Sequence, residues 1–572
     1  MRCLVLAAHL PLSALYCSTA SREYFLKVVW KEAGELKENV IGRGTWLDKV
    51  AYRIIEREKQ LGRSLTLLRV ESGLGASGIP HVGSLGDAVR AYGVKLALED
   101  QGFRSELIAY SDDFDGLRKV PAGFPKWLEG EIGRPVALIQ DPFGCHESYG
   151  AHMSGMLLDA LDKLSIEYRF QSGAEAYKKG LLNTQIQLIL DNAQRIGQYI
   201  AETLGQKKFE EVLPYYPLCG KCGRLYVAEA YAYDKERHTV AYRCRGAEIG
   251  GRWVEGCGYE GEVDVLSGRG KLSWKGEMAA RWAALDIRFE AYGKDIADSV
   301  KVNDWISEAV LNYPHPYHIR YELFLDKSGR KISKSAGNVF TPQMWLRYGT
   351  PQSLLLLMYK RIVGTRTLSV EDIPNYMDEY DQLEDVYFGV KKVDNPAELR
   401  KMRGLYEYIN HLKPPPKPSI HVPYRLLTHL AAVAPKEGRV EFVLKKLAAY
   451  GFVKEADELL KVKIALASNW ADDFVKFEPV KLELSLEERK ALAEVAEAIR
   501  RLEDAQQIQN SIFEAAKRNN LKAPDLFKRL YQILILSDHG PRLGPYIVDI
   551  GREKAAQLIE EAIAKSEEGS KL

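Results

Sequence analysis

Apolar and polar positions recur with clear periods along this chain, and the first such run predicts a strand, a turn and a helix. Leu65 to Val70 are mostly apolar and predict a β-strand. A glycine-rich turn follows, and apolar residues then recur at helical spacing until Gly102 ends the helix. Leu107 to Tyr110 predict the next strand. This order is typical of an α/β fold in which a helix crosses between parallel strands.

The last third of the chain has helical periodicity. The proline-rich stretch 411–423 predicts a break of polyproline character. Ser485 and Glu488 then form the pattern of a capping box at a helix start. Downstream of this box, apolar residues build a single stripe, which predicts core packing and consists of Leu492, Val495, Ile499, Leu502, Ile508 and Ile512.

Length and composition describe a large globular protein. The 572 residues predict about three to five domains, and 46% hydrophobic and 28% charged residues are close to globular averages. After the N-terminal stretch, no segment approaches the ~20 apolar residues of a membrane span, so we expect no membrane partner. The net charge of +2 excludes attraction of the whole molecule to nucleic acid, so an RNA partner would require local basic patches.

The first residues carry a conflicting signal. Met1 and Arg2 precede an apolar stretch with small residues, which is the pattern of a secretory signal. Five of the seven cysteines, however, cluster in patterns typical of metal sites, and metal-binding thiolates favour a reducing compartment. We therefore expect a cytoplasmic protein in which residues 1–44 are an N-terminal extension or are not translated. Cys3 and Cys17 have no evident role.

Glycines and a histidine mark the turn before the first helix. The sequence SGIPHVGS places Gly78, Gly83 and Ser84 around His81. Glycines allow the backbone to approach a flat ligand closely, and the unpaired amides of a helix start attract phosphate. His81 can donate a hydrogen bond to charge that develops on a phosphoryl oxygen. Taken alone, however, the histidine is better explained as a helix cap or a core residue.

A second motif lies far along the chain, in the sequence GRKISKSAGNV. We call its residues Lys331–Ser335 the lysine motif; it contains Lys331, Ser333, Lys334 and Ser335. Two ammonium groups among glycines and serines suit a polyanionic ligand such as a phosphate. A solvated turn has the same composition, so this motif alone does not establish a function.

The pair HVGS and KISKS resembles the two nucleotide-binding motifs of class I aminoacyl-tRNA synthetases. Further stretches in the family's order are VESG, DDFDGLRKVP, DPFGCHESY, GKLSWKGEMAARWAALDIRFEAYGKD and RYELF. From Trp46 to at least Tyr387, the chain is therefore similar to the archaeal type of class I lysyl-tRNA synthetase. The resemblance implies activation of lysine by ATP with Mg²⁺, through lysyl-adenylate, and transfer to the terminal ribose of tRNA(Lys).

The resemblance also implies roles for single residues. Transition-state stabilisation would fall to His81, Lys331 and Lys334. The expected ATP contacts are Gly78, Gly83, Ser84, Gly293, Asp295, Ser333 and Ser335, and the expected lysine contacts are Gly73, Gly75, Trp274 and Tyr321. Without the resemblance, Trp274 and Tyr321 are explained as core aromatics and Asp295 as a helix cap. Glu71 is either a partner for the ammonium group of lysine or half of a structural ion pair.

Two groups of residues have the chemistry of metal ligands. One group suits a structural zinc ribbon and comprises Cys219, Cys222, Cys244 and Cys257. Its second arm is irregular, since the sequence RGAEIGGRWVEG separates the last two cysteines, and a disulfide remains the alternative in an oxidising compartment. The resemblance implies a second zinc site at Asp141, Cys145, His146 and His152; a surface cluster is the alternative. We assign both sites to structure and not to catalysis.

The chain departs from the family pattern beside the expected lysine pocket. Family members have Thr and Pro where this chain has Gly75 and Ala76, Asn in place of Ser84, and His in place of Ile296. The Gly75 and Ile296 positions border the amino-acid pocket, so each uncompensated loss of a polar group there is expected to weaken lysine binding by about 1 to 3 kcal/mol. A synthetase for another amino acid and a catalytically silent paralogue that binds RNA therefore stay open. A small-molecule nucleotidyltransferase shares the His-x-Gly-x motif but normally lacks zinc ribbons and a long helical tail, so the length of this chain argues against it.

The expected architecture is a Rossmann-like catalytic domain with zinc-binding insertions, followed by an all-α anticodon-binding cage. The expected boundaries are 45–345 for the catalytic domain, about 214–266 for the zinc ribbon, 346–400 for a stem-contact region and 401–572 for the cage. Two helices are expected after the lysine motif, followed by an exposed basic stretch in which Lys360, Arg361 and Arg366 contact tRNA or are simply solvated. We expect a monomer.

Overall fold

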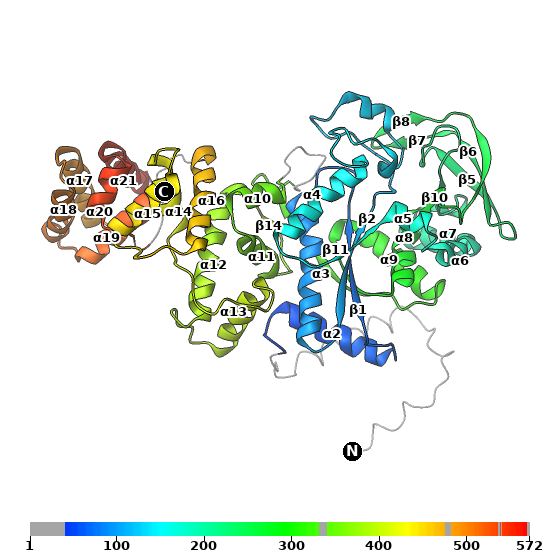
Figure 1. Ribbon diagram of the computed structural model, residues 1–572, viewed down its shortest axis with the longest axis horizontal. Helices are drawn as coiled ribbons and strands as arrows, with labels where there is room; N and C mark the ends of the chain where they lie inside the picture. Colours follow the sequence, from blue (N-terminus) through cyan, green and yellow to red (C-terminus); the bar gives the residue numbers. More distant parts are fainter. Residues whose placement is uncertain (1–40, 331–339, 475–481, 536–537, 539, 569–572) are drawn as a thin grey trace, which may run out of the picture.

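A five-stranded parallel sheet forms the centre of the computed structural model, which describes residues 41–330, 340–474, 482–535, 538 and 540–568 (Figure 1). The strand order is β12-β11-β1-β2-β3, as in a Rossmann-like fold. The strands are β1 (Leu68–Leu74), β2 (Ser105–Ser111), β3 (Arg169–Ser172), β11 (Ile287–Gly293) and β12 (Tyr317–Tyr321). The predicted α/β fold is confirmed. The first strand begins at Leu68 and not at Leu65, because pairing with β2 begins there.

Helices cover both faces of this sheet, and alternate side chains of each strand enter two different cores. Helix α3 (Val82–Asp100) crosses from β1 to β2 and is buried along most of its length. Leu107 and Ala109 pack in the core on the α3 side. Ile108 and Tyr110 pack in the core on the side of α8 (Trp274–Leu285). A strand buried on both faces reads as an unbroken apolar run, which is why β2 was recognisable.

The chain leaves the sheet between β3 and β11. It first forms helices α5 (Gly173–Lys178), α6 (Asn183–Asp191) and α7 (Ala193–Leu204). It then forms short antiparallel pairs from β4 (Tyr215–Pro217), β5 (Ala228–Asp234), β6 (Thr239–Cys244), β7 (Gly246–Ile249), β8 (Arg252–Glu255), β9 (Glu260–Asp264) and β10 (Gly270–Leu272). Strands β5, β6 and β9 form one sheet, and β7 and β8 form a hairpin.

The segment after β12 links the sheet to the helical part of the chain. Strand β13 (Phe324–Leu325) pairs with β14 (Arg366–Thr367), and the two expected helices are α10 (Pro342–Tyr348) and α11 (Pro351–Tyr359). The expectation that Arg366 is exposed is wrong. Its guanidinium is buried 4.8 Å from the ring centroid of Phe324 and donates a hydrogen bond to the carbonyl of Leu357.

The C-terminal part consists of helices, which lie at the opposite end of the molecule from β5–β8 (Figure 1). They are α12 (Ile373–Tyr387), α13 (Pro396–Ile409), α14 (Tyr424–Val433), α15 (Arg439–Ala449), α16 (Glu458–Phe474), α17 (Leu486–Arg501), α18 (Ala505–Arg518), α19 (Ala523–Ile535), α20 (Leu543–Ile550) and α21 (Arg552–Glu568). The capping box at Ser485 is confirmed. The predicted single stripe is divided between α17 and α18, because Asp504 begins a new helix by accepting the Gln507 N–H.

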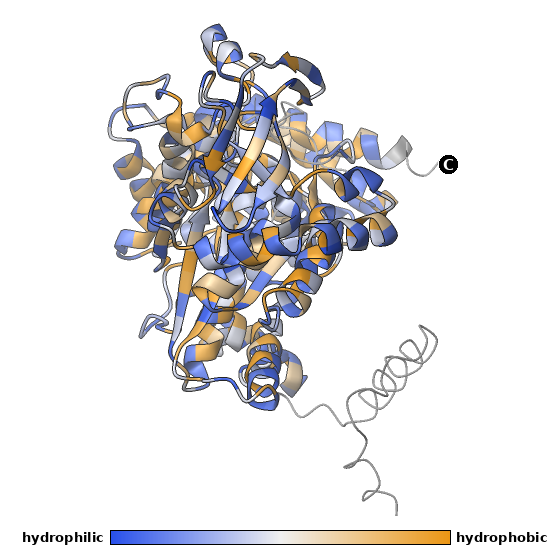
Figure 2. Cartoon of the chain, turned by 90° about the vertical axis from the view of Figure 1, so that its right-hand side faces the viewer, coloured by the Kyte–Doolittle hydropathy of each residue, from blue (hydrophilic) through white to orange (hydrophobic). Residues whose placement is uncertain are grey.

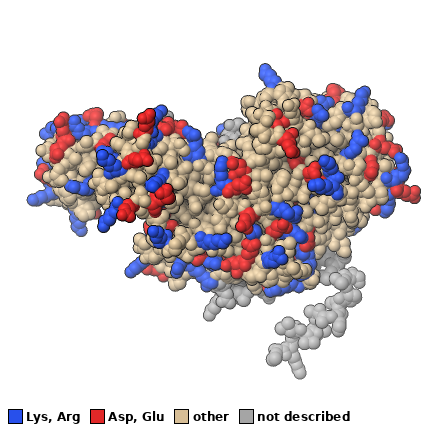
Figure 3. Space-filling model, in the orientation of Figure 1, with Lys and Arg blue, Asp and Glu red and all other residues tan. Residues whose placement is uncertain are grey.

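The surface carries both signs of charge. On the face shown in Figure 3, Lys and Arg are interspersed with Asp and Glu, in keeping with the small net charge. Many helices show hydrophobic and hydrophilic stripes (Figure 2). Within the described ranges, no helix combines the length and the apolarity that a membrane crossing requires.

Candidate active site

A cavity of about 240 Å³ opens at the carboxyl ends of β1, β11 and β12, beside the start of α3. The predicted site residues that line it are Gly73, Gly75, His81, Gly83, Ser84, Trp274, Gly293, Asp295 and Tyr321. Gly78 is instead buried in the turn and is not among the lining residues. The lysine motif lies outside the described residues. Ligands of parallel α/β sheets bind at this edge, where strand ends meet helix starts.

His81 is the N-cap of α3, and this contact determines how its ring is used. Its Nδ1 accepts a hydrogen bond from the Ser84 backbone N–H at 3.2 Å. A backbone N–H can only donate, so Nδ1 carries no proton and the neutral ring carries its proton on Nε2. Capping and function are therefore compatible, because the cap uses Nδ1 alone and the ring also lines the cavity.

Phe324 and Phe340, which precede and follow the lysine motif in the sequence, lie at the cavity wall and at the start of α3, respectively. Before the motif, Phe324 lines the cavity, and the turn that follows ends with the Arg330 N–H bonded to Asp326 Oδ1 at 3.0 Å. After the motif, the carbonyl of Phe340 accepts the N–H of Val82, the first residue of α3, at 2.8 Å. Phe340, which follows the motif in the sequence, thus lies beside the helix start that carries His81.

A buried charge cluster forms the floor of the cavity, and the sequence patterns did not reveal it. Arg281 of α8 is fully buried; its Nε lies 2.9 Å from Glu71 Oε1, and its Nη1 donates to Asp112 Oδ1 at 2.8 Å. Its Nη2 lies 3.6 Å from Glu290 Oε1. We call Glu71, Asp112 and Glu290 the acidic floor. One guanidinium is the partner of three carboxyl groups. The acidic floor therefore either carries a net negative charge or has at least one protonated carboxyl group.

The energetics of the acidic floor follow from burial. Desolvation raises the pKa of Glu71 to about 8 and that of Asp112 to about 7, although Arg281 opposes both shifts. Asp112, Glu290 and Arg281 line the cavity, whereas Glu71 does not. Glu71 contacts Arg281 and does not line the cavity, which agrees with the structural one of the two interpretations open from the sequence. The sequence did contain a signal for this buried cluster, because its charged residues lie inside otherwise apolar elements.

Trp274 and Tyr321 present aromatic surfaces to the same cavity. The indole Nε1 of Trp274 donates to Asp115 Oδ2 at 3.3 Å, and the hydroxyl of Tyr321 donates to Asp87 Oδ1. These contacts orient both rings while leaving them at the cavity wall. Gly75 and Ile296, where the chain departs from the family pattern, also line the cavity.

Arg90 is a further lining residue that the sequence analysis missed. It is buried on α3, and its Nε and Nη1 have no hydrogen-bond partner; the nearest carboxylate oxygen, Asp87 Oδ1, is 3.9 Å away. Its guanidinium lies 4.2 Å from the ring centroid of Tyr321. Burial lowers its pKa to about 10. A desolvated cation with unsatisfied donors at a cavity suits an anionic group of a ligand.

Comparison with known proteins decides the family. The family model described as "tRNA synthetases class I (K)" matches residues 44–412. The chain belongs to the class I lysyl-tRNA synthetase family. It is 54% identical to the lysine--tRNA ligase of Cenarchaeum symbiosum (strain A), over 91% of this chain and 99% of that protein. It is 30% identical to the lysine--tRNA ligase of Rickettsia bellii (strain OSU 85-389), over 92% of this chain and 100% of that protein.

A solved structure also shows a distant likeness. It is the crystal structure of a glutamate tRNA ligase from Elizabethkingia meningosepticum in complex with its amino acid. The match has a TM-score of 0.32 and 14% identity, and it covers 87% of this chain and 99% of that chain. This likeness is too low for a comparison of sites.

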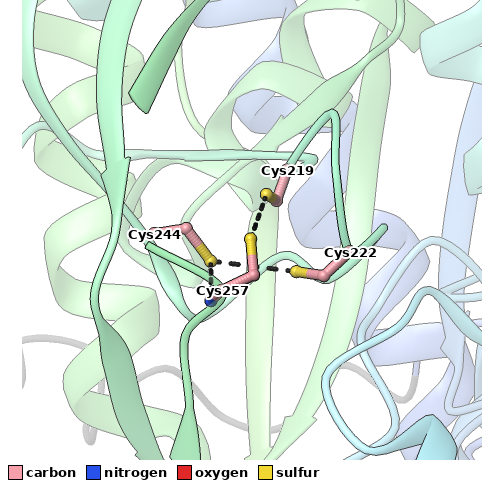
Figure 4. Close-up of side chains that lie close together, drawn as sticks. All are labelled: Cys219, Cys222, Cys244 and Cys257. Atoms are coloured by element: carbon pink, nitrogen blue, oxygen red, sulfur yellow. Dashed lines mark hydrogen bonds between the residues drawn. The ribbon is translucent and has the colours of Figure 1, made fainter. Parts of the chain in front are cut away.

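In this class I lysyl-tRNA synthetase, the four predicted ribbon cysteines converge (Figure 4). The Sγ atoms of Cys219 and Cys257 are 3.6 Å apart, and those of Cys222 and Cys244 are 3.8 Å apart. Tetrahedral zinc with Zn–S bonds of about 2.3 Å places sulfurs about 3.8 Å apart, whereas a disulfide requires about 2.05 Å. The donor set therefore fits zinc and not a disulfide. Hairpin β7–β8 occupies the irregular spacer and brings Cys244 beside Cys257.

The second predicted set, from the loop before α4 (Tyr149–Lys163) and its first turn, also comes together. Cys145 Sγ lies 3.1 Å from His146 Nδ1 and 3.3 Å from His152 Nδ1, and Asp141 Oδ1 lies 3.3 Å from His152 Nδ1. Asp141 accepts the backbone N–H groups of Cys145 and His146, which turns these adjacent side chains toward one point. Thiolate, imidazole and carboxylate donors suit zinc.

Replacing Cys222 by Ser should remove one equivalent of zinc per chain and make residues 226–262 sensitive to protease, because a hydroxyl is a poor zinc ligand. The loss of affinity should exceed the roughly 10- to 100-fold that the loss of an outer-shell partner costs. Elemental analysis and limited proteolysis measure both effects. Cys145→Ser is the matched control, since it should remove zinc only from the other site. Unchanged zinc in Cys222→Ser would contradict the assignment.

Proposed function

We propose that this chain ligates lysine to tRNA(Lys) in two steps at the described cavity, with ATP activating lysine first. Family membership supports the reaction, since its relatives bear the name lysine--tRNA ligase. The observation that carries the assignment to this site is the cavity itself. On one side of the cavity lies a capped helix start, which suits a phosphate group. On the other side lie the acidic floor and two aromatic faces, which suit a cationic amino acid.

Lysine presents two ammonium groups joined by an apolar stem. Asp112 and Glu290 line the cavity and offer carboxylate oxygens beyond the charge that Arg281 neutralises. Trp274 and Tyr321 offer faces for the stem and for cation–π attraction. We propose that lysine binds here with its ammonium groups toward carboxylates, together with the backbone at Gly73 and Gly75.

The nucleotide would lie beside the start of α3. The lysine carboxylate attacks the α-phosphate in line, the bond from the α-phosphate to the bridging oxygen breaks, and pyrophosphate leaves. Charge builds on the phosphoryl oxygens in this step, and a ring N–H of His81 can stabilise it. We propose that Lys331 and Lys334, with Ser333 and Ser335, neutralise the triphosphate from the lysine motif. Gly83, Ser84, Gly293 and Asp295 would contact ATP.

Two kinds of metal ion would complete the enzyme. Mg²⁺, held mainly by the phosphate oxygens of ATP, would supply positive charge to them, and we assign it no protein ligand. Zinc would bind at the four ribbon cysteines and, in a second structural site, at Asp141, Cys145, His146 and His152. In the second step, the terminal ribose hydroxyl of tRNA attacks the carbonyl carbon of lysyl-adenylate, the acyl–phosphate bond breaks, and AMP leaves. This transfer requires no covalent enzyme intermediate.

The larger organisation is also a proposal. We propose that residues 346–400 contact the tRNA stem, that 401–572 read the anticodon, and that the enzyme acts as a cytoplasmic monomer. The regular helices of the C-terminal part support the proposal of a binding cage, but they do not identify the residues that contact tRNA. The exposed Lys360, which pairs with Glu379, stays a candidate for contact with tRNA.

Aminoacylation and pyrophosphate exchange, run with lysine, ATP and tRNA(Lys), test this function. tRNA should be present, because the family resembles class I enzymes that activate their amino acid only with RNA bound. We expect turnover with lysine and none with arginine or glutamate. A zinc-loaded, folded protein that binds tRNA(Lys) without turnover would favour the second candidate, a silent paralogue. That candidate draws its support from Gly75 and Ile296 at the cavity wall.

A further inference from the structure

The side chain of Arg90 extends from helix α3 into the wall of the cavity and points back toward the helix start. It is 1% exposed and is one of the lining residues. A methyl group added at Gly86, one turn closer to His81, would lie 2.8 Å from Arg90 Nη1 and 3.4 Å from its Cζ. Long helical side chains lean in this direction. The guanidinium therefore lies over Gly86, about one turn from the start of α3.

The contacts of Arg90 with the described residues leave its positive charge poorly satisfied. Its Nε and Nη1 have no hydrogen-bond partner there. Asp87 Oδ1 lies 3.9 Å from Nη1 and already accepts the hydroxyl of Tyr321. The rings of Tyr321 and Phe324 lie 4.2 and 5.8 Å from the guanidinium, and their faces attract positive charge but carry no acceptor oxygen. A buried ionic donor without an acceptor is unfavourable, which points to an acceptor that a ligand supplies.

A second buried guanidinium adds positive charge to this part of the structure. Arg366 lies 4.8 Å from the ring centroid of Phe324, which Arg90 also approaches. It donates to the carbonyl of Leu357 and is not a lining residue. Burial lowers the pKa of Arg90, Asp87 opposes this shift, and the charge of Arg366 adds to it. Among the described residues, Asp87 is the one carboxylate that pairs with either guanidinium, so positive charge is in excess here.

Opposite charges thus line different parts of the cavity. The acidic floor contacts Arg281 of α8, on one face of the central sheet, whereas Arg90 belongs to α3, on the other face. The acidic floor suits ammonium groups. The guanidinium suits phosphate or carboxylate, whose oxygens match its planar fork. Both anions belong to the reacting pair, since ATP carries phosphates and lysine carries a carboxylate.

We propose that Arg90 binds an oxyanion of the reacting substrates, and that its place one turn from the start of α3 makes this oxyanion a phosphate group of ATP. This inference rests on the proposed function, which supplies both anions. Phosphate bound at Arg90 would leave the carboxylate of lysine free to attack. The carboxylate has the same chemistry toward a guanidinium, so the experiment distinguishes the two sources.

Calorimetry of the full, zinc-loaded chain with tRNA(Lys) tests the proposal, with one ligand added at a time so that no reaction occurs. Arg90→Met removes the charge and the donors but keeps an apolar side chain. Its Kd for ATP should rise on the order of 10- to 100-fold, because charged hydrogen bonds are lost, while its Kd for adenosine should not change. Arg366→Met is the matched control. It removes a guanidinium from the same ring without reaching the cavity, so both Kd values should stay at the wild-type level.

Lysine and lysinol, which lacks the carboxylate, form the second arm of the experiment. A rise in Kd for lysine, with lysinol and ATP unchanged, would keep the oxyanion site and assign it to the carboxylate. Unchanged Kd values for both ATP and lysine in folded Arg90→Met would overturn the proposal. Equal rises for ATP and adenosine, and for lysine and lysinol, would also overturn it, because they identify a packing role alone.

If Arg90→Met fails to fold, Gly86→Ala decides. Alanine is a better helix residue than glycine, and Gly86 does not line the cavity, so the methyl group acts by displacing the guanidinium. Met358 Sδ would lie 3.1 Å from this methyl group and needs only a small shift. The Kd for ATP should rise several-fold and that for adenosine should not. Wild-type Kd values for ATP and lysine in Gly86→Ala would then overturn the proposal.

These affinities are measured without turnover, so the two proposals can fail separately. A selective loss of ATP affinity in Arg90→Met, together with no lysine transfer by the wild type, would contradict the proposed function alone. Turnover of lysine by the wild type, together with unchanged affinities in Arg90→Met, would contradict this inference alone.

Discussion

Replacing His81 by Asn should lower kcat for tRNA-dependent lysine activation by on the order of 10²- to 10³-fold while leaving the free energy of unfolding nearly unchanged. The side-chain oxygen of Asn is a good N-cap acceptor and can replace Nδ1 in the bond from the Ser84 N–H, which is 3.2 Å long in the wild type. It cannot supply the second ring N–H of a histidine that lines the cavity. Pyrophosphate exchange and urea unfolding measure the two quantities separately.

His81→Ala is the matched control for this separation. It loses both functions, so the free energy of unfolding should fall by about 0.5 to 2 kcal/mol in addition to a comparable loss of kcat. If His81→Asn turned over at the wild-type rate, the histidine would be a helix cap and nothing more. The interpretation that was better supported from the sequence alone would then be correct.

Replacing Arg281 by Met should lower the free energy of unfolding by about 3 to 5 kcal/mol, because it leaves the acidic floor buried without the guanidinium that its three carboxylates share. Methionine keeps much of the side-chain volume, so the loss reports charge and not a cavity. Urea unfolding followed by circular dichroism at pH 5 and pH 8 measures the effect.

The pH dependence has a definite sign. The pKa of Glu71 is raised to about 8 and that of Asp112 to about 7 in the folded chain, above their unfolded values, so both carboxyls take up protons on folding. The stability that this uptake contributes is fully present below about pH 4 and is lost as the pH rises through the folded pKa values. Without Arg281 these pKa values rise further. The penalty of Arg281→Met should therefore be smaller at pH 5 than at pH 8.

Adding Glu71→Gln to Arg281→Met provides an internal control. The double variant removes one buried carboxyl that must otherwise take up a proton or stay charged, and it should recover about 1 to 3 kcal/mol at pH 8 relative to Arg281→Met. Little recovery, together with a loss that is equal at both pH values, would mean that Arg281 acts through packing alone. The acidic floor would then not hold the excess charge on which the proposed lysine site depends.

The acidic floor changes the expected effect of the departures from the family pattern at Gly75 and Ile296 on lysine binding. Both residues line the cavity, so polar groups that family members offer there are missing in this chain. Asp112 and Glu290 line the same cavity and offer carboxylate oxygens there. Electrostatic recognition of a cationic amino acid can therefore persist without those polar groups, which favours the enzyme over the silent paralogue.

Local rules explain what was predictable. The β1–α3–β2 order, the His81 cap, the Ser485 capping box and the Cys219–Cys222 arm each depend on residues only a few positions apart. Hydrophobic periodicity, secondary-structure propensity and helix-cap chemistry all depend on neighbours within that range, so they can be recognised in the sequence. Most of the predicted cavity residues came from motifs of this kind, whereas Gly78 did not reach the cavity wall, and the roles of Lys331 and Lys334 stay predictions.

Tertiary structure alone decided the rest. Arg281 meets Asp112 across 169 positions of sequence, and no local pattern distinguishes such a pair from charges on a solvated surface. Arg366 looked exposed but is buried against Phe324, and hairpin β7–β8 closes the zinc ribbon that spacing made doubtful. The sequence by itself thus determined the elements, their caps and the family motifs. Which charges are buried together was decided only when distant segments packed, because desolvation depends on every neighbour in space.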